Sequence, residues 1–333
     1  GVFHFAAQVA VTSSLADPGL DFQVNALGTL NLLEALRVLD RRPPFIFTST
    51  NKVYGCLTGL STRRAQNRYQ PVDPLLAAHG IDEQQPLDFQ SPYGCSKGTA
   101  DQYVLEYARS FGLPATVFRM SCIYGPHQFG TEDQGWIAHF LIRALQGQPI
   151  TIYGDGCQVR DALFIDDLVH AFQLAFAALR EEARARSSQA AGSSQAPRAL
   201  SGQAFNMGGG PDRAISLLEL LDHMGALHGR QPAVRRGAWR LGDQRYYVSN
   251  TRKFTQATGW QPQVGLLEGI TMLNTWLVEQ PAHGPLVAAL PALDGRLPSG
   301  SKLRTAVAAS TDTAAYGGRA ADIAALPSRE SLV

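Results

Sequence analysis

The sequence predicts an α/β protein built on a parallel β-sheet, and three stretches near its start carry that prediction. Residues 2–7 are short and apolar and end in small side chains, which is typical of a buried parallel strand. Residues 22–39 carry leucine and valine at helical spacing, and Phe45–Phe47 is a second apolar run. A strand, a helix and a strand in this order are typical of neighbours in one parallel sheet.

The remaining elements continue the alternation. Asp17 and Pro18 predict a helix start, and the helix over 22–39 ends before Pro43 and Pro44. Residues 56–90 are polar and lack periodicity, so we expect a long surface loop. We predict further helices over 92–111, 134–146, 166–179, 216–228, 251–258 and 266–280, a strand over 115–119, and renewed structure over 204–209.

Composition excludes several classes of protein. The chain has 333 residues, of which 45% are apolar and 17% charged, with a formal net charge of +1. This is the balance of a globular protein, and it favours neither nucleic acid nor a membrane as partner. The four cysteines show no metal-ligand spacing, so we expect no metal site and free thiols in the cytoplasm.

Two stretches have the composition of segments outside a core. Residues 181–203 contain alanine, serine, arginine, glutamine and glycine without an aromatic side chain, which predicts a flexible insertion. Residues 281–333 are of low complexity and contain a single aromatic residue, Tyr316, so we expect most of this tail to be disordered.

Tyr93 and Lys97 are the first candidates for catalysis. They stand four residues apart on a predicted helix, so both project from one face. An ammonium group beside a phenol stabilises the phenolate and lowers the phenol's pKa, which would make Tyr93 a general base. A half-buried tyrosine beside a solvated lysine is the simpler interpretation of this pair taken alone.

A run of hydroxyl groups, Thr48-Ser49-Thr50, ends the second predicted strand. The carboxyl ends of parallel strands are where ligands bind in such sheets. The Thr50 hydroxyl could there share a proton with a substrate oxygen and with Tyr93, although an ordinary turn or helix-capping threonine would have the same sequence.

These residues belong to a longer series of motifs. The series comprises His4-Phe5-Ala6-Ala7, Asn25 with Gly28-Thr29, Ser49-Thr50-x-x-Val53-Tyr54-Gly55, Ser91-Pro92-Tyr93-x-x-x-Lys97, Arg119, Tyr124-Gly125-Pro126, Val159-Arg160-Asp161 and Phe205-Asn206-x-Gly208-Gly209. From residue 2 to about residue 280, the chain resembles the extended short-chain dehydrogenase/reductase family of nucleotide-sugar epimerases and dehydratases.

The resemblance implies a fold, a cofactor and partners. It implies a Rossmann-type doubly wound parallel sheet and a smaller C-terminal substrate domain, with NAD as cofactor and a nucleotide sugar as substrate. Residues 1–150 would form part of the NAD-binding domain, and residues 151–280 would bind the nucleotide sugar. The family often pairs through the helix that carries Tyr93 and Lys97, so a homo-oligomer is also implied.

The resemblance also assigns roles to residues. Tyr93 would be the base, Lys97 would lower its pKa, and Thr50 would bridge to the reacting hydroxyl. A surface salt bridge is the simpler interpretation of Arg160 and of Arg245. The implied cofactor contacts are His4, Ala6, Ala7, Asn25, Thr48, Ser49, Tyr93 and Lys97, and the implied substrate contacts are Gln8, Arg119, Gln134, Trp136, Arg160, Asn206 and Arg245.

Departures from the family pattern narrow the expected reaction. The 4,6-dehydratases carry an Asp-Glu pair just after the threonine, and the sugar-acid decarboxylases carry a glutamate at the second position. This chain has Asn51 and Lys52 there, which argues against both reactions. Cys122 stands where the family has an asparagine, which weakens one implied contact. A UDP-hexose 4-epimerase stays the alternative to a 2-epimerase. The segments that resemble the family's 2-epimerases are Ser49–Gly55, Asp133–Trp136, Gln158–Asp161 and Asp243–Arg245.

The largest departure lies before Val2. The family begins with a strand, a G-x-x-G-x-x-G turn that seats the cofactor's pyrophosphate, a helix and two further strands. The sequence shows none of these, so we expect the C-terminal portion of an epimerase, and weak NAD binding by these residues alone. The alternative is a non-catalytic binding protein.

Overall fold

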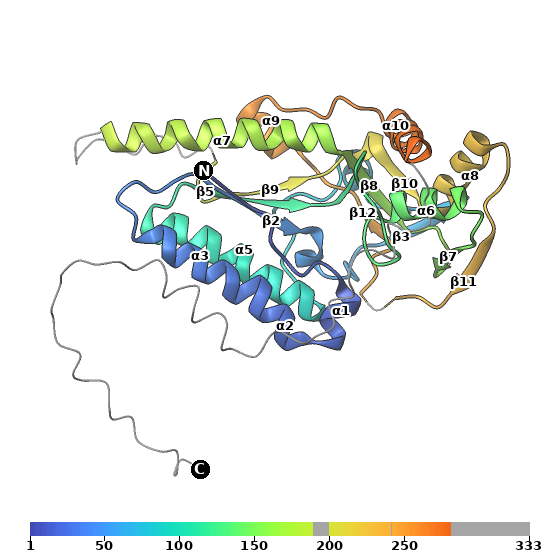
Figure 1. Ribbon diagram of the computed structural model, residues 1–333, viewed down its shortest axis with the longest axis horizontal. Coiled ribbons are helices and arrows are strands. Elements are labelled where there is room, and N and C mark those ends of the chain that lie inside the picture. The colour runs from blue at the N-terminus through green and yellow to red at the C-terminus, as the bar shows by residue number, and fades with distance from the viewer. Residues whose placement is uncertain (189–199, 241, 281–333) are drawn as a thin grey trace, which may run out of the picture. The chain divides into compact units, whose positions relative to one another are not determined.

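The computed structural model describes residues 1–188, 200–240 and 242–280, and its centre is a parallel four-stranded sheet in the order β1-β2-β5-β9 (Figure 1). Phe47 lies opposite His4 on one side and Val117 on the other, which aligns the carboxyl ends of the strands at one edge. The predicted parallel α/β sheet is therefore confirmed. The strands are β1 (Val2–His4), β2 (Phe45–Thr50), β5 (Ala115–Met120) and β9 (Ala204–Met207).

Helices cover both faces of this sheet, as a doubly wound fold requires (Figure 1). On one face, α3 (Gly28–Arg37) and α5 (Ser91–Phe111) bury Leu33 and Val104 against Phe45 and Phe47. On the other face, α7 (Ile165–Ser188) and α9 (Arg252–Thr258) pack against Ile46, Phe118 and Phe205. The alternating side chains of β2 thus serve two separate cores, which is why its whole length is buried.

Most of the chain between β1 and β2 is helical. Asp17 caps the predicted helix start, since its side chain accepts a hydrogen bond from the Leu20 N–H at 2.9 Å. The helix then runs without a break through one wide turn and ends well before the two prolines. Its parts are α2 (Pro18–Phe22), the π-helical turn η1 (Gln23–Leu27) and α3, preceded by a short helix that the sequence did not predict, α1 (Val11–Ala16).

The helix α5 has the expected bounds. Pro92 sits in its first turn, and Gly112 ends it in the left-handed conformation at φ 68°. Gly98 permits a close approach, because a Cβ atom there would lie 2.4 Å from the Phe89 ring. The helix can therefore lie tightly beneath the segment that leads into it.

A second body of strands and helices follows β5. Its core includes Tyr124, Phe140, Phe164 and Leu273, and the predicted helices at 134–146, 216–228 and 266–280 all contribute to it. Strand β9, from the same part of the sequence, instead joins the central sheet. The elements are β6 (Cys122–Tyr124), α6 (Trp136–Leu145), β7 (Ile150–Tyr153), β8 (Val159–Phe164), the 3-10 turn η3 (Pro211–Arg213), β10 (Ala214–Ser216), α8 (Leu217–His228), β11 (Val234–Gly237), β12 (Tyr246–Tyr247) and α10 (Leu266–Glu279).

The prediction of a long loop over residues 56–90 is wrong. This segment forms a hairpin of β3 (Thr62–Ala65) and β4 (Arg68–Pro71), followed by α4 (Pro74–His79). The hairpin is held from outside, since the Tyr69 N–H donates to the Cys157 carbonyl at 2.8 Å. Its strands are too short and polar to show alternation, so the tertiary contact decides their conformation.

The prediction of a flexible insertion over 181–203 is also wrong in part. Helix α7 continues to Ser188, and Leu200 is fully buried. The Glu182 carboxylate joins the two ends, because it accepts hydrogen bonds from the Leu200 and Ser201 N–H groups at 2.9 and 3.2 Å. Residues 189–199 and the tail over 281–333 lie outside the described part of the chain.

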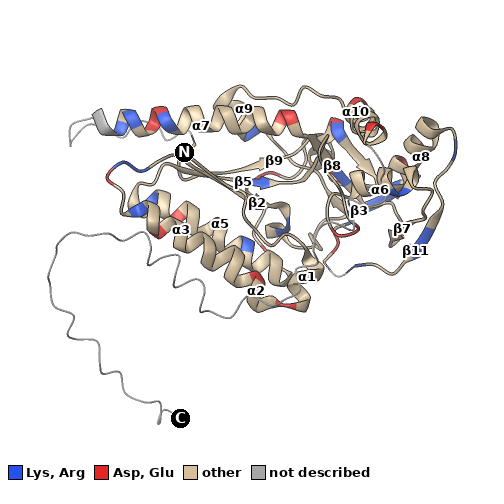
Figure 2. Cartoon of the chain, viewed as in Figure 1, with Lys and Arg blue, Asp and Glu red and all other residues tan. Residues whose placement is uncertain are grey.

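Charges of both signs are spread over the described elements. Figure 2 shows charges of both signs near the C-terminal end of α7, while the middle of this helix carries no charged residue. Among the described helices, none is long and apolar enough to cross a membrane.

A buried ion pair attaches α5 to the central sheet. The Arg119 guanidinium on β5 donates two hydrogen bonds, each 2.9 Å long, to the two carboxylate oxygens of Asp101 on α5. Asp101 is fully buried and Arg119 is 4% exposed. A paired geometry of this kind fixes both the distance and the rotation of the helix relative to the strand.

Replacing Asp101 tests this attachment. Asp101→Asn leaves the Arg119 charge buried without a counterion, so we expect the free energy of unfolding to fall by about 3–5 kcal/mol in urea denaturation. The matched control is Glu106→Gln on the same helix, whose pairing with Arg109 is exposed and should contribute no more than about 1 kcal/mol. Equal losses in the two variants would contradict the role given to Asp101.

Candidate active site

The carboxyl edge of the central sheet brings the predicted catalytic residues together. Lys97 lies under this edge, where its amine donates a 2.6 Å hydrogen bond to the Thr48 carbonyl and stands 4.2 Å from the centre of the Phe47 ring. The Thr48 hydroxyl in turn donates to the His4 carbonyl at 3.0 Å. Lys97 on α5 therefore connects β2, and through it β1, to the helix that carries Tyr93.

Thr50 and Tyr93 lie side by side at this edge. Both side chains are 8% exposed, and the Thr50 hydroxyl hydrogen-bonds the Tyr93 phenol. The same hydroxyl accepts a 3.2 Å hydrogen bond from the Lys52 N–H and so caps the short turn η2 (Asn51–Tyr54). Thr50 therefore caps a turn and also contacts the phenol, and its role toward a substrate oxygen stays a prediction.

The pKa of Tyr93 departs from the sequence-based expectation. Burial raises it to about 12, and the hydrogen bond from Thr50 opposes this rise without reversing it. Lys97 does not lower the pKa of Tyr93 here, because its amine faces the Thr48 carbonyl and the Phe47 ring. The expectation of a phenol poised near neutral pH is therefore wrong for this structure.

Asn25 holds the chain beyond β1 against the catalytic helix. Its side-chain oxygen accepts from the Gln8 N–H at 2.9 Å, and its amide donates to the Gln8 carbonyl and the Ser96 hydroxyl, both at 3.0 Å. Ser96 lies between Tyr93 and Lys97 on α5. Asn25, itself 1% exposed, thus supports the site from behind and fixes where the segment after β1 passes.

His4 is also part of this framework. Its ring Nε2 hydrogen-bonds the Thr29 hydroxyl at 3.0 Å, and burial followed by the nearby Lys97 charge lowers its pKa. Ala6 is exposed and Ala7 half-buried where the chain leaves β1. The two small side chains leave the backbone open on that side.

The edge of the sheet has the donor set that a nicotinamide riboside requires. Two buried atoms here, Ser49 Oγ and Gln8 Oε1, have no hydrogen-bond partner among the described residues. Together with the Tyr93 phenol and the Lys97 amine they offer hydroxyl, amide and ammonium groups to a polar ligand. The residues present therefore fit the polar groups of the nicotinamide half of NAD.

Arg119 and Asn206 are placed differently from the substrate contacts implied by the resemblance. Arg119 pairs with Asp101 and also donates to the Tyr54 hydroxyl at 3.1 Å. That hydroxyl donates to Asn206 Oδ1 at 2.8 Å, and Asn206 donates its amide to the Ile81 carbonyl at 2.9 Å. Both side chains are buried and bonded within the chain, so here they act as framework.

Arg160 and Arg245 lie in unlike surroundings. Arg160 on β8 is 8% exposed and forms a 2.6 Å ion pair with Asp243. Arg245 is exposed, with its guanidinium 5.4 Å from the centre of the Tyr69 ring, and it pairs with no acid among the described residues. A surface salt bridge therefore describes neither arginine.

Gln134 and Trp136 lie beside the catalytic edge. The Gln134 amide donates to the Val9 carbonyl, one residue beyond the segment that Asn25 holds. The Trp136 indole N–H donates to the Cys122 sulfur at 3.2 Å, so the residue that replaces the family's asparagine anchors this tryptophan. Arg240 pairs with Asp133 at 3.3 Å and so joins this loop to the segment before Asp243.

Sequence reasoning missed several of the residues that build the site. Ser96, Tyr54 and Asp101 each hydrogen-bond one of the predicted residues. For Lys52, the sequence indicated only that this position carries no acid. One signal was readable: Asp101 stands four residues after Lys97 on the same face of the helix. The contacts of Tyr54 and Lys52 cross more than 150 residues of sequence and left no local signal.

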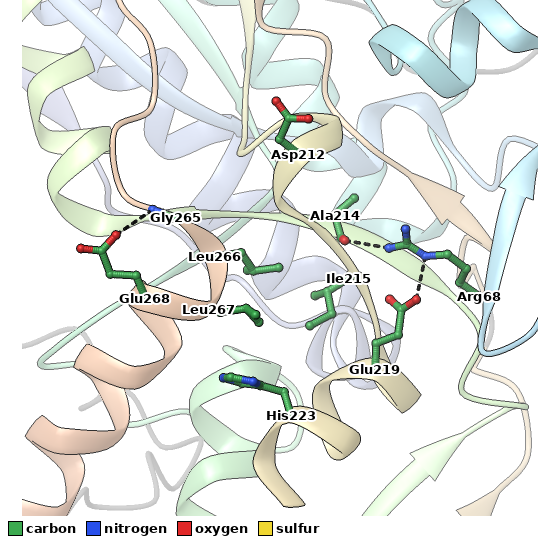
Figure 3. Close-up of a pocket in the computed structure, with 10 residues that line it drawn as sticks. All are labelled: Arg68, Asp212, Ala214, Ile215, Glu219, His223, Gly265, Leu266, Leu267 and Glu268. Atoms are coloured by element: carbon green, nitrogen blue, oxygen red, sulfur yellow. Dashed lines mark hydrogen bonds and ion pairs between the residues drawn. The ribbon is translucent and has the colours of Figure 1, made fainter. Parts of the chain in front are cut away.

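A separate hollow of about 610 Å³ lies between α8 and α10, away from all these residues (Figure 3). Three of its charged side chains are already bonded within the chain. Arg68 pairs with Glu219 at 2.9 Å and donates to the Ala214 carbonyl, while Glu268 accepts from the Gly265 N–H at the start of its own helix. This hollow offers no site comparable to the sheet edge.

Comparison with known proteins assigns the family. Residues 1–188 match the model of the NAD dependent epimerase/dehydratase family, and the chain belongs to that family. A CDP-paratose 2-epimerase of Salmonella typhi is 41% identical over 279 residues, which cover 82% of this chain and 76% of that protein. A UDP-glucose 4-epimerase of Mycolicibacterium smegmatis is 32% identical over 270 residues, covering 81% of this chain and 73% of that one.

Solved structures agree with this assignment. A Thermotoga maritima UDP-glucose 4-epimerase with UDP-glucose superposes with a TM-score of 0.65 at 28% identity, over 83% of this chain and 76% of that one. A Thermus thermophilus UDP-glucose 4-epimerase with NAD gives 0.64 at 29% identity, over 84% and 78%. The predicted Rossmann-type fold, the cofactor NAD and the epimerase class are confirmed.

The buried amine of Lys97 should titrate far below an ordinary lysine. Burial lowers its pKa from 10.5 to about 8, so NMR of ε-carbon-labelled lysine should show a titration near pH 8 that Lys97→Met removes. Between pH 8 and 10.5 the unfolded chain binds more protons than the folded one. The stability that Lys97 contributes should therefore grow as pH rises through that window. A midpoint near 10.5 would contradict the burial of this amine.

Proposed function

We propose that the protein is an NAD-dependent epimerase that inverts carbon 2 of CDP-paratose and so yields CDP-tyvelose. The arrangement of Thr50, Tyr93 and Lys97 at the carboxyl edge of the sheet carries this proposal. The 41% identity to a CDP-paratose 2-epimerase supports the choice of sugar and nucleotide. The residues expected to contact NAD and the nucleotide sugar remain part of the proposal.

The chain's residues would move a proton while a hydride leaves and returns. Tyr93 takes the proton of the carbon-2 hydroxyl as that carbon loses its hydride, so the sugar becomes a 2-keto sugar. Bound NAD contributes reversible hydride acceptance. After the keto sugar has presented its other face, the hydride returns to carbon 2 and Tyr93 returns the proton to the oxygen. The inverted alcohol and the starting protonation state result.

Thr50 and Lys97 contribute to this task in different ways. Because burial raises the pKa of Tyr93 to about 12, the phenolate needs both a hydrogen bond and a cation nearby. Thr50 supplies the hydrogen bond. Lys97 does not supply that charge, because its amine faces the Thr48 carbonyl; it instead holds the helix that carries Tyr93 against the edge of the sheet.

The positions after Thr50 argue against elimination. A dehydratase needs an acid and a base beside the reacting sugar, but Asn51 and Lys52 offer an amide and an amine. We therefore place the chemistry at a single carbinol carbon. A UDP-hexose 4-epimerase needs the same three catalytic residues and is the second candidate, supported by the 32% identity to a UDP-glucose 4-epimerase.

We further infer a cytoplasmic homo-oligomer. All four cysteines are free thiols, which supports a reducing compartment. Leu20, Phe22, Val24 and Leu27 are each more than a third exposed on the helical segment before α3. Apolar side chains gathered on one segment support pairing of two copies through these helices.

Substrate and mechanism are tested together by NMR of the sugar ring. We expect the protein, as its gene encodes it and with added NAD, to invert carbon 2 of CDP-paratose. Tyr93→Phe should lower kcat by at least about 10²–10⁴-fold because it removes the acid–base group. The control is Tyr103→Phe, an exposed tyrosine of the same helix, which should keep wild-type activity.

Other outcomes would change the proposal. Inversion of carbon 4 of UDP-glucose without action on CDP-paratose would establish the 4-epimerase. Binding of a nucleotide sugar without inversion of any carbon would favour a non-catalytic binding protein.

A further inference from the structure

Two positively charged side chains from distant elements bind consecutive residues, Gly242 and Asp243. The Lys52 amine, from the turn η2, donates a 3.1 Å hydrogen bond to the Gly242 carbonyl. The Arg160 guanidinium, from β8, pairs at 2.6 Å with the carboxylate of the next residue, Asp243. The two positive groups therefore lie side by side and are held by consecutive residues.

This cluster has an excess of positive charge. Lys52 and Arg160 share a single carboxylate, since the nearby acids Glu132 and Asp133 pair with Arg240. Burial, and then the charge of Arg160, lower the pKa of Lys52, whereas Asp243 raises it. The two positive charges repel each other, and a second anion beside them would offset this repulsion.

The cluster is joined to the catalytic residues through the backbone. The Lys52 N–H donates to the Thr50 hydroxyl at 3.2 Å, and that hydroxyl contacts Tyr93. A ligand held by the Lys52 amine would thus lie one side-chain length from the reacting groups. This spacing fits a substrate whose anionic group is attached next to the sugar that reacts.

The carboxylate of Asp243 indicates which kind of ligand the two cations can bind. A carboxylate and a phosphate present the same kind of paired oxygens to a guanidinium. The Asp243 side chain is 20% exposed, and beyond Arg160 it receives one 3.4 Å hydrogen bond, from the Gln158 amide. Its carboxylate is accessible enough to be exchanged for an incoming anion.

We propose that Lys52 is a substrate-positioning residue that, together with Arg160, seats the diphosphate of the nucleotide sugar, and that Asp243 occupies this seat until the diphosphate replaces it. The assignment rests on the proposed function for the identity of the substrate. It adds a role for Lys52 and for Asp243 that the choice of reaction does not require. Its distinctive consequence is that Asp243 competes with the ligand.

Calorimetric titration of the protein with CDP, CMP and inorganic pyrophosphate tests the seat. Lys52→Met should weaken CDP and pyrophosphate binding by about tenfold or more, as expected for a lost charge-assisted hydrogen bond, and CMP binding by less. Lys52→Arg should restore most of the affinity. Asp243→Asn should tighten CDP binding, because it removes the competing charge and leaves the shape unchanged.

The control variant is Lys253→Met, which removes a second lysine bound to a backbone carbonyl, that of Ala204 at 2.8 Å, and should leave CDP binding unchanged. Thermal unfolding of each variant separates loss of binding from loss of fold. The proposal is overturned if Lys52→Met binds CDP as the wild type does. It is equally overturned if Asp243→Asn weakens binding, since Asp243 then only orients Arg160, or if the wild type binds none of the three probes.

The proposed diphosphate seat and the proposed reaction can be refuted independently of each other. Binding of CDP and pyrophosphate that depends on Lys52, without inversion of carbon 2, would refute the proposed function and keep the seat. Inversion of carbon 2 together with binding that is independent of Lys52 would refute the seat and keep the function.

Discussion

The buried amine of Lys97 is the contact on which the site depends. Its hydrogen bond to the Thr48 carbonyl holds α5 against the carboxyl edge of β2, while the ring of Phe47 stabilises its charge. Burying an ammonium group is costly, and the lowered pKa of Lys97 expresses that cost. The cost is tolerated because the same contact places Tyr93, one helical turn earlier, beside Thr50. The relative position of Tyr93 and Thr50 therefore depends on this one side chain.

Around this contact, polar side chains act as supports more than as ligands. Asp101 and Arg119 set the rotation of α5, and Asn25 holds the segment beyond β1. These groups are buried and mutually bonded, which restricts the side chains they touch to one arrangement. Lys52 and Arg160, the two cations that share the Asp243 carboxylate, lie on the side where the second body of the chain meets the catalytic edge. The framework groups and the groups that we propose to bind the ligand thus occupy different positions.

Much of the fold could be predicted because its signals are local. Apolar runs marked β2 and β5, helical spacing marked α5, α8 and α10, and Asp17 marked a helix start. The sequence did not predict the hairpin of β3 and β4 or the C-terminal turns of α7. Their conformation depends on contacts with Cys157 and Leu200 rather than on their own residue pattern. In the site, the spacing of Tyr93 and Lys97 was decisive. The buried partners of Arg119 and Asn206 could not be predicted, because a linear motif does not show what packs against a side chain.

The sequence by itself determined the parallel α/β order, the shared helix face of Tyr93 and Lys97, and the absence of acids after Thr50. Each of these follows from the identity or spacing of neighbouring residues, which backbone geometry converts directly into position. Only the tertiary structure decided that burial would raise the pKa of Tyr93, that Arg119 would pair with Asp101, and that Lys52 would meet Arg160 beside Asp243. Desolvation and charge pairing depend on what packs around a group. Residues nearly two hundred positions apart, such as Lys52 and Gly242, become neighbours only when the chain has folded.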